Sequence, residues 1–238
     1  MPIPPLYRCP RVSRPVALTG RLTDPAWGKA PAVSLALTED GRTPVQGTTA
    51  RILRDDIHLY VGFSCVDRDI WGTHTKHDDP LYNEDVVEIF ICPAPPRKKA
   101  ALWLYYEFQL SARNVTFDAV ILHPREASDR KRNPRLRPVI GWDCQGLASA
   151  THVDGRVSRT DPRKNPRRRP ARGWTAELAV PFAEILGAPH TPPRNGDVWR
   201  INLYRIDHRR DGSEYAAWSP TRVFDYHVPE RFGKLLFT

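Results

Sequence analysis

The chain is a succession of short apolar runs separated by proline, glycine and aspartate. In many of these runs Val, Ile, Tyr and Phe alternate with polar residues, which is typical of half-buried strands. The 24 prolines agree with this pattern, because proline breaks helices but is common in the loops that join short strands. The sequence therefore predicts an all-β fold, a two-sheet antiparallel β-sandwich of jelly-roll or immunoglobulin-like type with short helical turns. A parallel α/β sheet is excluded, since it would need crossover helices.

Ten or so strands are expected at regular spacing. They fall within residues 33–37, 48–67 (a hairpin turning at Asp55-Asp56), 84–93, 102–122 (a pair), 146–155, 173–180, 197–207, 213–218 and 233–237. Two short helical turns are also expected. One has Asp24 as its N-cap and Pro25 at its first position, and the other opens at Pro181.

We expect one domain over residues 1–238, with basic loops rich in proline and arginine near 123–138 and 156–172. These loops supply much of the net charge of +9. Proline and arginine without periodicity indicate solvated loops rather than a folded basic surface, so binding of nucleic acid or another polyanion is kept only as an alternative.

Other features of the sequence bear on cellular location. No apolar run approaches the roughly 20 residues of a membrane helix, so we expect no membrane partner. Prolines occupy the opening residues where a secretory signal would have its apolar region, which favours a cytoplasmic location. The cysteines at 9, 65, 92 and 144 show no metal-binding spacing, and we expect four free thiols, although Cys9 and Cys144 could pair in an exported protein.

Two expected strands combine an apolar face with a polar one. Residues 87, 89 and 91 point one way, and Glu88 points the other way between apolar neighbours. In the next strand Glu107 and Gln109 share the face opposite the core set. A carboxylate among apolar residues is either paired in a salt bridge or meets a ligand. Both glutamates and Gln109 are therefore candidate ligand-binding residues.

The last third of the chain adds polar and aromatic candidates. Asn202 and Tyr204 share one face of an expected strand, and Arg205 follows where its alternation weakens. The irregular segment before the final strand carries Trp218, Tyr226 and His227. Flat rings with polar edges cover the C–H patch of a sugar, while amides and carboxylates bind its hydroxyls. The pattern predicts a sugar-binding groove on one sheet.

Eight motifs, taken in order, resemble the family 9 carbohydrate-binding modules and their stand-alone relatives. They are LTGRLTDPAW, HLYVGFSCVD, LYNEDVVEIFI, YYEFQLS, GWTAELAVPF, GDVWRINLYRID, AWSP and VPERFGKLLF, and they extend from about residue 15 to residue 238. The resemblance implies a β-sandwich that binds a mono- or oligosaccharide without catalysis, in connection with polysaccharide breakdown.

The resemblance also implies roles for particular residues. Similar modules hold their ligand between two tryptophans, and the matching positions here are Tyr82 and Tyr226. The strand carboxylate of the family matches Glu88, its strand asparagine matches Asn202, and an arginine of the family is replaced by Gln109. Apart from the resemblance, we expect Tyr204, Arg205, Trp218 and His227 at the rim of the site. The family's structural calcium is left open, because Asp67, Asp69, Asp78 and Asp79 form only oxygen-rich loops.

One further function stays open, and another is set aside. A glycoside hydrolase would need two carboxyls flanking one groove, and Glu88 with Glu107 is the pair to test, with His227 as a general base. Haem binding, known in related sandwiches, uses Met and His as axial ligands. Because the only methionine is Met1, haem is set aside.

Overall fold

The computed structural model describes residues 3–94, 102–124, 136–164 and 171–238. Regular structure in these ranges consists of β-strands and four short 3-10 helices. The strands are β1 (Leu6–Cys9), β2 (Val33–Ser34), β3 (Ala36–Leu37), β4 (Thr48–Arg54), β5 (His58–Val66), β6 (Val86–Cys92), β7 (Leu102–Ser111), β8 (Thr116–Pro124), β9 (Arg137–Val139), β10 (Ala148–Asp154), β11 (Gly173–Pro181), β12 (Val198–Arg209), β13 (Gly212–Ala217) and β14 (Gly233–Phe237). The helices are η1 (Pro25–Lys29), η2 (Leu81–Asn83), η3 (Phe182–Glu184) and η4 (Pro229–Arg231).

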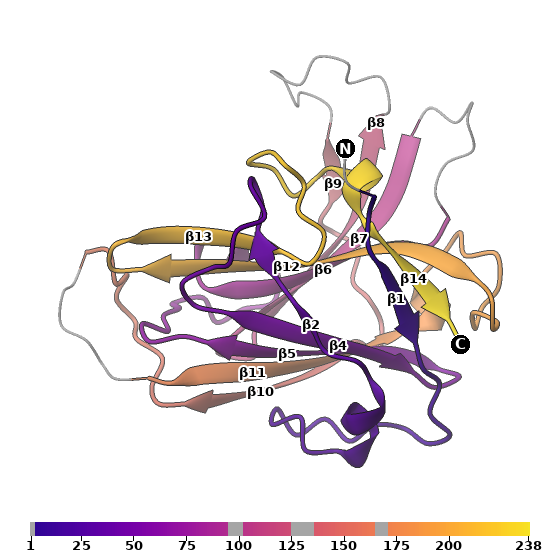
Figure 1. The fold of residues 1–238 in the computed structure, drawn as a ribbon, viewed down its shortest axis with the longest axis horizontal. Helices are drawn as coiled ribbons and strands as arrows, with labels where there is room; N and C mark the ends of the chain where they lie inside the picture. Colours follow the sequence, from indigo (N-terminus) through magenta and orange to yellow (C-terminus); the bar gives the residue numbers. More distant parts are fainter. Residues whose placement is uncertain (1–2, 95–101, 125–135, 165–170) are drawn as a thin grey trace.

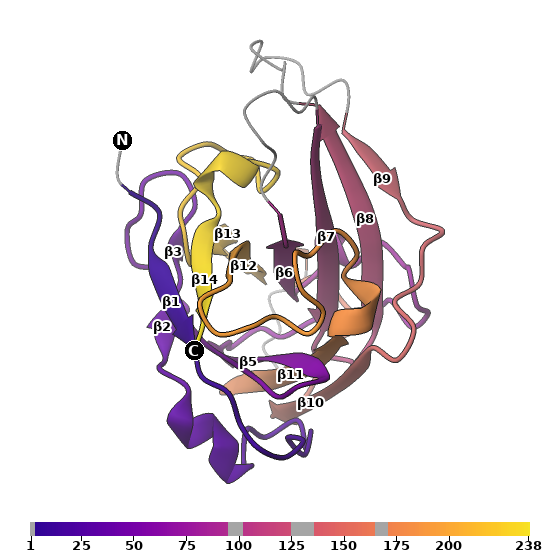
Figure 2. The same cartoon turned by 90° about the vertical axis from the view of Figure 1, so that its right-hand side faces the viewer.

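The strands form two sheets, which Figures 1 and 2 show one against the other. The larger sheet has the order β1-β14-β12-β6-β7-β8-β9, with β13 and β3 continuing beside β12. The smaller sheet has the order β10-β11-β5-β4-β2. All strand pairs are antiparallel except β1 with β14 at one edge of the larger sheet. The predicted fold class, an all-β sandwich of two sheets with short helical turns, is confirmed.

The main core lies between the two sheets. Ile89, Phe108 and Leu203 of the larger sheet belong to the same buried cluster as Val61 and Leu178 of the smaller sheet. Ile89 and Phe108 belong to the apolar sets that strand alternation predicts for the core. Such burial is the main stabilising term of the fold.

The outer faces of both sheets are also covered. The N-terminal segment and η1 place Val12 and Trp27 over Tyr60 of β5. The C-terminal segment, drawn in yellow in Figure 1, brings Phe232 and the ring of Tyr226 against the outer face of the larger sheet. The outer face of the larger sheet is therefore partly covered by the chain's own C-terminal segment.

The expected elements are found, with four differences, one of which is that the 3-10 helices η2 and η4 were not expected. The segment 33–37 is split, because β2 pairs with β4 in the smaller sheet while β3 pairs with β13 in the larger one. The short edge strands β1 and β9 were not expected, since each lies next to prolines and loop residues that hide a strand pattern. The helical turn at 181 begins one residue later, with Pro181 as the cap of η3.

Local signals in the sequence have the expected effects. The carboxylate of Asp24 accepts a hydrogen bond from the backbone N–H of Ala26 and so caps η1. Asp55 accepts bonds from the N–H groups of Ile57 and His58, which closes the hairpin between β4 and β5. The prediction of four free thiols is confirmed, since the cysteines at 9, 65, 92 and 144 are buried and unpaired.

Two predictions touch segments that are only partly described. Residues 125–135 of the first basic loop and residues 165–170 of the second lie outside the described residues. Within the described ranges, no helix is long and apolar enough to cross a membrane.

Candidate functional site

A cavity of about 380 Å³ lies on the outer face of the larger sheet. It is enclosed by β6, β7 and β8 below, by η2 and the β9 region at the sides, and by the C-terminal segment. Its lining residues are Thr38, Tyr82, Glu88, Phe90, Glu107, Gln109, Phe117, Ile121, Leu136, Pro138, Ile140, Ile206, Tyr215, Phe224, Asp225, Tyr226 and His227.

Strand register places the polar floor of the cavity. Glu88 of β6 pairs directly with Gln109 of β7, which pairs in turn with Phe117 of β8. Two residues further along the same strands, Phe90 of β6 pairs with Glu107 of β7. Since residues two apart on a strand share a face, both carboxyls and the amide rise from the same side of the sheet.

The floor residues are almost wholly shielded from water. The side chain of Gln109 donates a hydrogen bond from Nε2 to Oε1 of Glu107 at 2.6 Å. Glu88 Oε1 and Gln109 Oε1 have no hydrogen-bond partner among the described residues. A buried acceptor without a partner costs about 1–3 kcal/mol, so these two oxygens mark a place where a bound molecule can supply donors.

Burial also changes the ionisation of the two carboxyls. It raises the pKa of Glu107 to about 7. It raises the pKa of Glu88 well above its usual value, and the neighbouring charge of Glu107 adds to that effect. No described Lys or Arg lines the cavity to oppose these shifts.

Aromatic rings form much of the wall. Tyr82, on η2, is 50% exposed, and its ring meets that of Phe117 edge-on at 6.3 Å. Tyr226 stacks on Tyr204 with ring centroids 4.1 Å apart and donates its hydroxyl to the backbone oxygen of Arg205. One face of the Tyr226 ring is thus covered by protein, whereas Tyr82 is open at the mouth of the cavity.

His227 lies at the cavity beside the ring of Phe90. Its Nδ1 is 2.9 Å from the hydroxyl of Tyr105. Burial lowers the pKa of His227 to about 4, so its ring is neutral near neutral pH. It is therefore a hydrogen-bonding group and a weak base.

Six of the ten predicted site residues meet at this cavity. They are Tyr82, Glu88, Glu107, Gln109, Tyr226 and His227. Their roles as ligand-binding residues stay predictions. The structure does bring these six side chains together at one cavity, as a shared binding site needs.

The other four predicted residues do not line the cavity. Asn202 is buried, and its amide binds the backbone of Ser219 and Leu203. Tyr204 lies beneath Tyr226 and donates to its backbone oxygen. Trp218 belongs to the core between the sheets, where its ring meets Tyr7 edge-on. These three side chains support the fold around the site.

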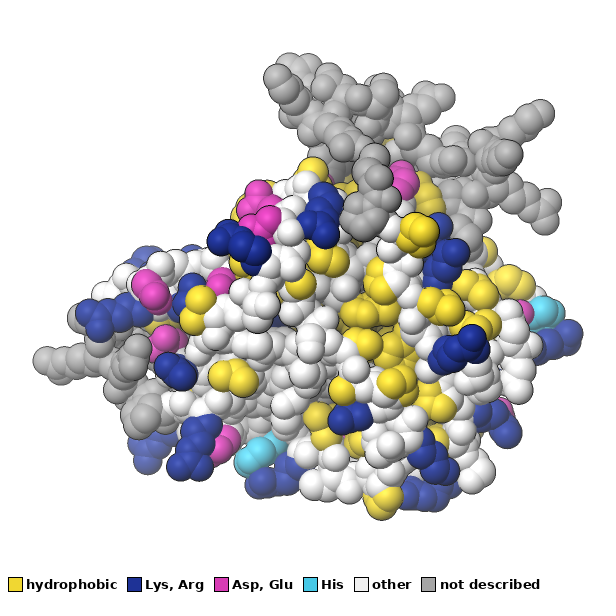
Figure 3. All heavy atoms as spheres, viewed as in Figure 1, with side chains coloured by type: hydrophobic (Ala, Val, Ile, Leu, Met, Phe, Trp, Pro, Cys, Tyr) yellow, Lys and Arg dark blue, Asp and Glu magenta, His cyan; other side chains and the backbone are white. Residues whose placement is uncertain are grey.

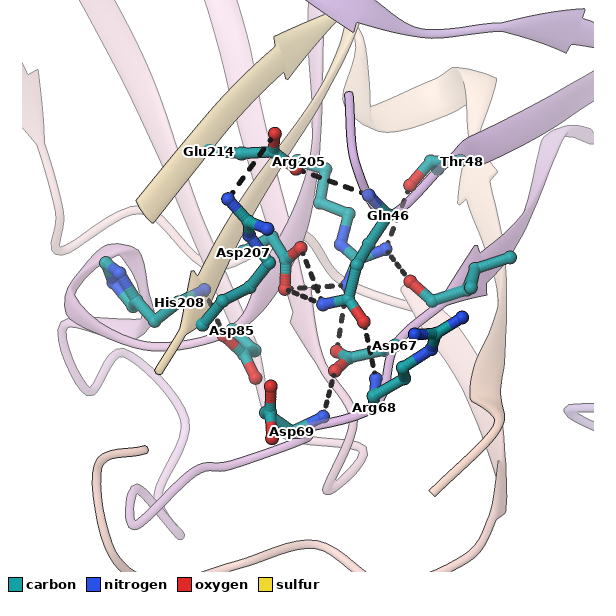
Figure 4. Close-up of polar contacts among 12 residues, drawn as sticks. Gln46, Thr48, Asp67, Arg68, Asp69, Asp85, Arg205, Asp207, His208 and Glu214 are labelled. Carbon is teal, nitrogen blue, oxygen red and sulfur yellow. Dashed lines mark hydrogen bonds and ion pairs between the residues drawn. The ribbon is translucent and has the colours of Figure 1, made fainter. Parts of the chain in front are cut away.

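Arg205 is placed on the opposite face from the one expected. Its guanidinium lies between the sheets and donates to Asp67 at 2.8 Å and to Asp207 at 3.1 Å. It also donates to Thr48 Oγ1 and to the backbone oxygen of Val66 on the smaller sheet (Figure 4). A rim position for Arg205 is therefore a correction, caused by continued alternation along β12.

Sequence reasoning missed several apolar lining residues. Ile206, Phe117 and Ile121 follow from the alternation of their strands and could have been assigned. Tyr215 and Phe224 could not, because their ring contact at 4.6 Å joins β13 to an irregular segment. No local pattern in the sequence indicates that contact.

Two groups of side chains have the composition of cation ligands. Asp67, Asp85 and Asp207 lie close together, but their carboxylates already accept bonds from Arg205, Gln46 and backbone N–H groups (Figure 4). This buried group therefore does not fit calcium, which needs six to eight free oxygen ligands. The second group, His77 with Asp78 and Asp143, is on the surface.

Comparisons with known proteins were made by sequence and by structure. Residues 18–120 match a family model described as carbohydrate family 9 binding domain-like. No curated protein matches the chain.

The fold is shared with solved structures. A candidate carbohydrate-binding protein from Bacteroides uniformis superposes with a TM-score of 0.69 at 12% identity, covering 99% of this chain and 100% of that one. A family 9 carbohydrate-binding module from Caldicellulosiruptor kristjanssonii, in complex with cellotriose, has a TM-score of 0.58 at 14% identity, covering 98% and 93%. The same module in complex with glucose gives a TM-score of 0.58 at 14% identity, covering 97% and 95%.

These likenesses are of two kinds, one in sequence and one in fold. The resemblance predicted from the sequence is confirmed: the chain carries a carbohydrate family 9 binding domain-like sequence at residues 18–120, within a β-sandwich of the same fold as those structures.

Proposed function

We propose that the protein binds a mono- or oligosaccharide, without catalysis, in the cavity on the larger sheet. The observation that carries this proposal is the pair of buried acceptor oxygens, Glu88 Oε1 and Gln109 Oε1, at the floor of an aromatic-walled cavity. Sugar hydroxyls supply the missing donors. The similar structures in complex with cellotriose and glucose support the same function.

The shape and lining of the cavity suit a small sugar. Its volume of about 380 Å³ is within the range of sites for small molecules, which begins near 300 Å³. The ring of Tyr82 offers a flat apolar surface for the C–H groups on one face of a sugar. The polar side chains at the floor of the cavity bind the hydroxyl groups at the edge of the sugar ring. An affinity from micromolar to millimolar is expected, about −8 to −4 kcal/mol. We also propose that this sugar binding serves the breakdown of polysaccharides.

The arrangement favours binding over hydrolysis. A glycosidase places its two carboxyls on either side of the bond to be cleaved. Glu88 and Glu107 instead rise from adjacent strands on one side of one sheet, and Glu107 Oε1 is already engaged by the amide of Gln109. The low pKa of His227 makes it a poor general base.

The described surface gives little support to polyanion binding. On the face in Figure 3, Lys and Arg side chains are scattered, and Asp or Glu side chains stand beside several of them. The described end of one basic loop is also partly neutralised, because Arg163 forms an ion pair with Asp161 at 2.8 Å.

Calorimetric titration with glucose, cellobiose and longer glucans tests the proposal. Saturable binding of one sugar per chain, unchanged between low and high salt, is expected. Affinity that collapses with added salt would indicate polyanion binding instead. Release of reducing ends from an oligosaccharide, lost in Glu88→Gln, would contradict a non-catalytic role.

A further inference from the structure

With its carboxyls ionised, the floor of the cavity offers more acceptors than donors. Gln109 directs one of its two Nε2 N–H donors to Glu107, and its Oε1 faces no protein donor. Glu88 Oε1 is in the same position, and both side chains are at least 98% buried. A ligand that fills this floor must therefore bring several donors to a small area.

The floor also lacks positive charge. Its two carboxyls, Glu88 and Glu107, are joined in the wall by a third, Asp225, and no described lining residue is Lys or Arg. His227 is the only described imidazole at the lining, and it is already engaged with Tyr105. The remaining titratable groups that face the floor are phenols, at Tyr82, Tyr215 and Tyr226.

Other buried carboxylates in this chain do have partners. Between the sheets, Arg205 binds Asp67 and Asp207. On the outer face of the smaller sheet, Glu177 accepts bonds from Trp27 Nε1 at 2.7 Å and from the backbone N–H of Thr19 at 2.9 Å. Only at the cavity does the described part of the chain leave a buried carboxylate oxygen without a partner.

We infer that the cavity selects a sugar that carries a protonated amino group over a neutral sugar of the same size. This inference rests on the proposed sugar-binding function and adds the class of ligand. An ammonium group supplies three donors and the absent positive charge to the floor formed by Glu88, Glu107 and Gln109. The ion pair forms away from water, where charge-assisted hydrogen bonds are strongest.

Binding of the ammonium group is coupled to release of a proton. Because the pKa of Glu107 is about 7 and that of Glu88 is higher than usual, the pair holds protons near neutral pH. The ammonium ion stabilises both carboxylates, and the displaced proton passes to the buffer. The measured heat of binding therefore depends on the ionisation enthalpy of the buffer.

The test is calorimetric titration with glucosamine, glucose and N-acetylglucosamine near neutral pH. Glucosamine is expected to bind at least about tenfold more tightly than glucose, a difference of about 1.4 kcal/mol. N-acetylglucosamine, whose nitrogen is neutral, should show no such gain. The preference should fall severalfold in Glu88→Gln and, separately, in Glu107→Gln. Glu184→Gln, on η3 outside the cavity, is the matched control and should keep it.

The outcomes separate this inference from the proposed function. Equal or weaker binding of glucosamine relative to glucose overturns the inference and leaves sugar binding standing. Failure of all three sugars and of longer glucans to bind overturns the proposed function itself. A preference that survives both glutamate variants, checked for folding by circular dichroism, also overturns the inference.

Discussion

At the scale of single residues, two buried glutamates differ in whether their carboxylate oxygens have hydrogen-bond partners. Glu177 is fully buried and has partners for both carboxylate oxygens. Glu88 is 2% exposed and leaves one oxygen without a described partner. A buried oxygen without a hydrogen-bond partner lowers the stability of the fold. Its presence in a folded protein therefore indicates a role in binding or chemistry rather than in folding.

The two glutamates should respond differently to the same substitution. Near pH 8, Glu88→Gln is expected to leave thermal stability unchanged or raise it, because it removes a carboxyl that is costly to ionise. Glu177→Gln should lower the free energy of unfolding by about 1–3 kcal/mol, because it weakens the bonds to Trp27 and Thr19. Thermal denaturation of both variants measures the difference. A larger loss in Glu88→Gln would show that its carboxylate has a structural partner.

Tyr82 provides a test of stacking that spares the core. Tyr82→Ala should weaken sugar binding by about 1 kcal/mol or more, since an exposed ring at the mouth of the cavity is lost. Tyr82→Phe keeps the ring and is the matched control. If both variants bind like the parent protein in calorimetric titration, Tyr82 does not contact the ligand. Tyr226→Ala should weaken binding as well, but it also removes the stack on Tyr204.

At the scale of elements, β12 joins the core to the site. Tyr204 stacks on Tyr226 of the cavity wall. The next residue, Arg205, lies between the two sheets and bonds to Thr48 and Asp67. Strand alternation makes both functions possible on one strand, because neighbouring side chains point to opposite faces.

The ion cluster around Arg205 is expected to be essential for stability. Arg205→Ala should lower the free energy of unfolding by about 3–5 kcal/mol, because it leaves Asp67 and Asp207 buried without a counter-charge. Arg200→Ala, on the same strand, removes a partly exposed guanidinium bound to a backbone oxygen and is the control, with a loss of about 1 kcal/mol. Equal losses in denaturant titrations of the two variants would contradict a special role of the cluster.

Alternation within strands predicted most of the fold and the floor of the site. The positions of Glu88, Glu107 and Gln109 follow from a two-residue period alone, and so does the inner set around Phe108. Rim residues could not be assigned in this way. Arg205 is predicted at the rim of the site, and only tertiary contacts from the smaller sheet reveal its partners.

At the scale of the whole molecule, buried carboxyls make stability depend on pH. Burial raises the pKa of Asp67 and of Asp118 to about 6, that of Glu107 to about 7, and that of Asp85 well above its usual value. A raised folded pKa means that the folded protein binds more protons than the unfolded chain in this interval. Stability therefore decreases as pH rises from the unfolded pKa through the folded one.

The buried histidines act in the opposite direction but over a lower range. The pKa of His208 and of His227 is lowered to about 4, so their contribution to stability grows between about pH 4 and pH 6.5 and is complete above it. Above about pH 6.5 the carboxyls with raised pKa values lower the stability, and nearer pH 8.5 the four buried thiols, whose pKa values burial also raises, act in the same direction. The melting temperature is therefore expected to be lower at about pH 8.5 than at about pH 6.5, and Glu107→Gln should reduce the difference. A melting temperature that rises over this interval would contradict the assigned ionisation.

The most direct test of the central claim is a crystal structure of the protein with a bound sugar. We expect the sugar to fill the cavity on the larger sheet, with its donors within hydrogen-bond distance of Glu88 Oε1 and Gln109 Oε1. A sugar bound elsewhere, for example in the polar pocket around Arg54 and His190, with the cavity filled only by water, would contradict it.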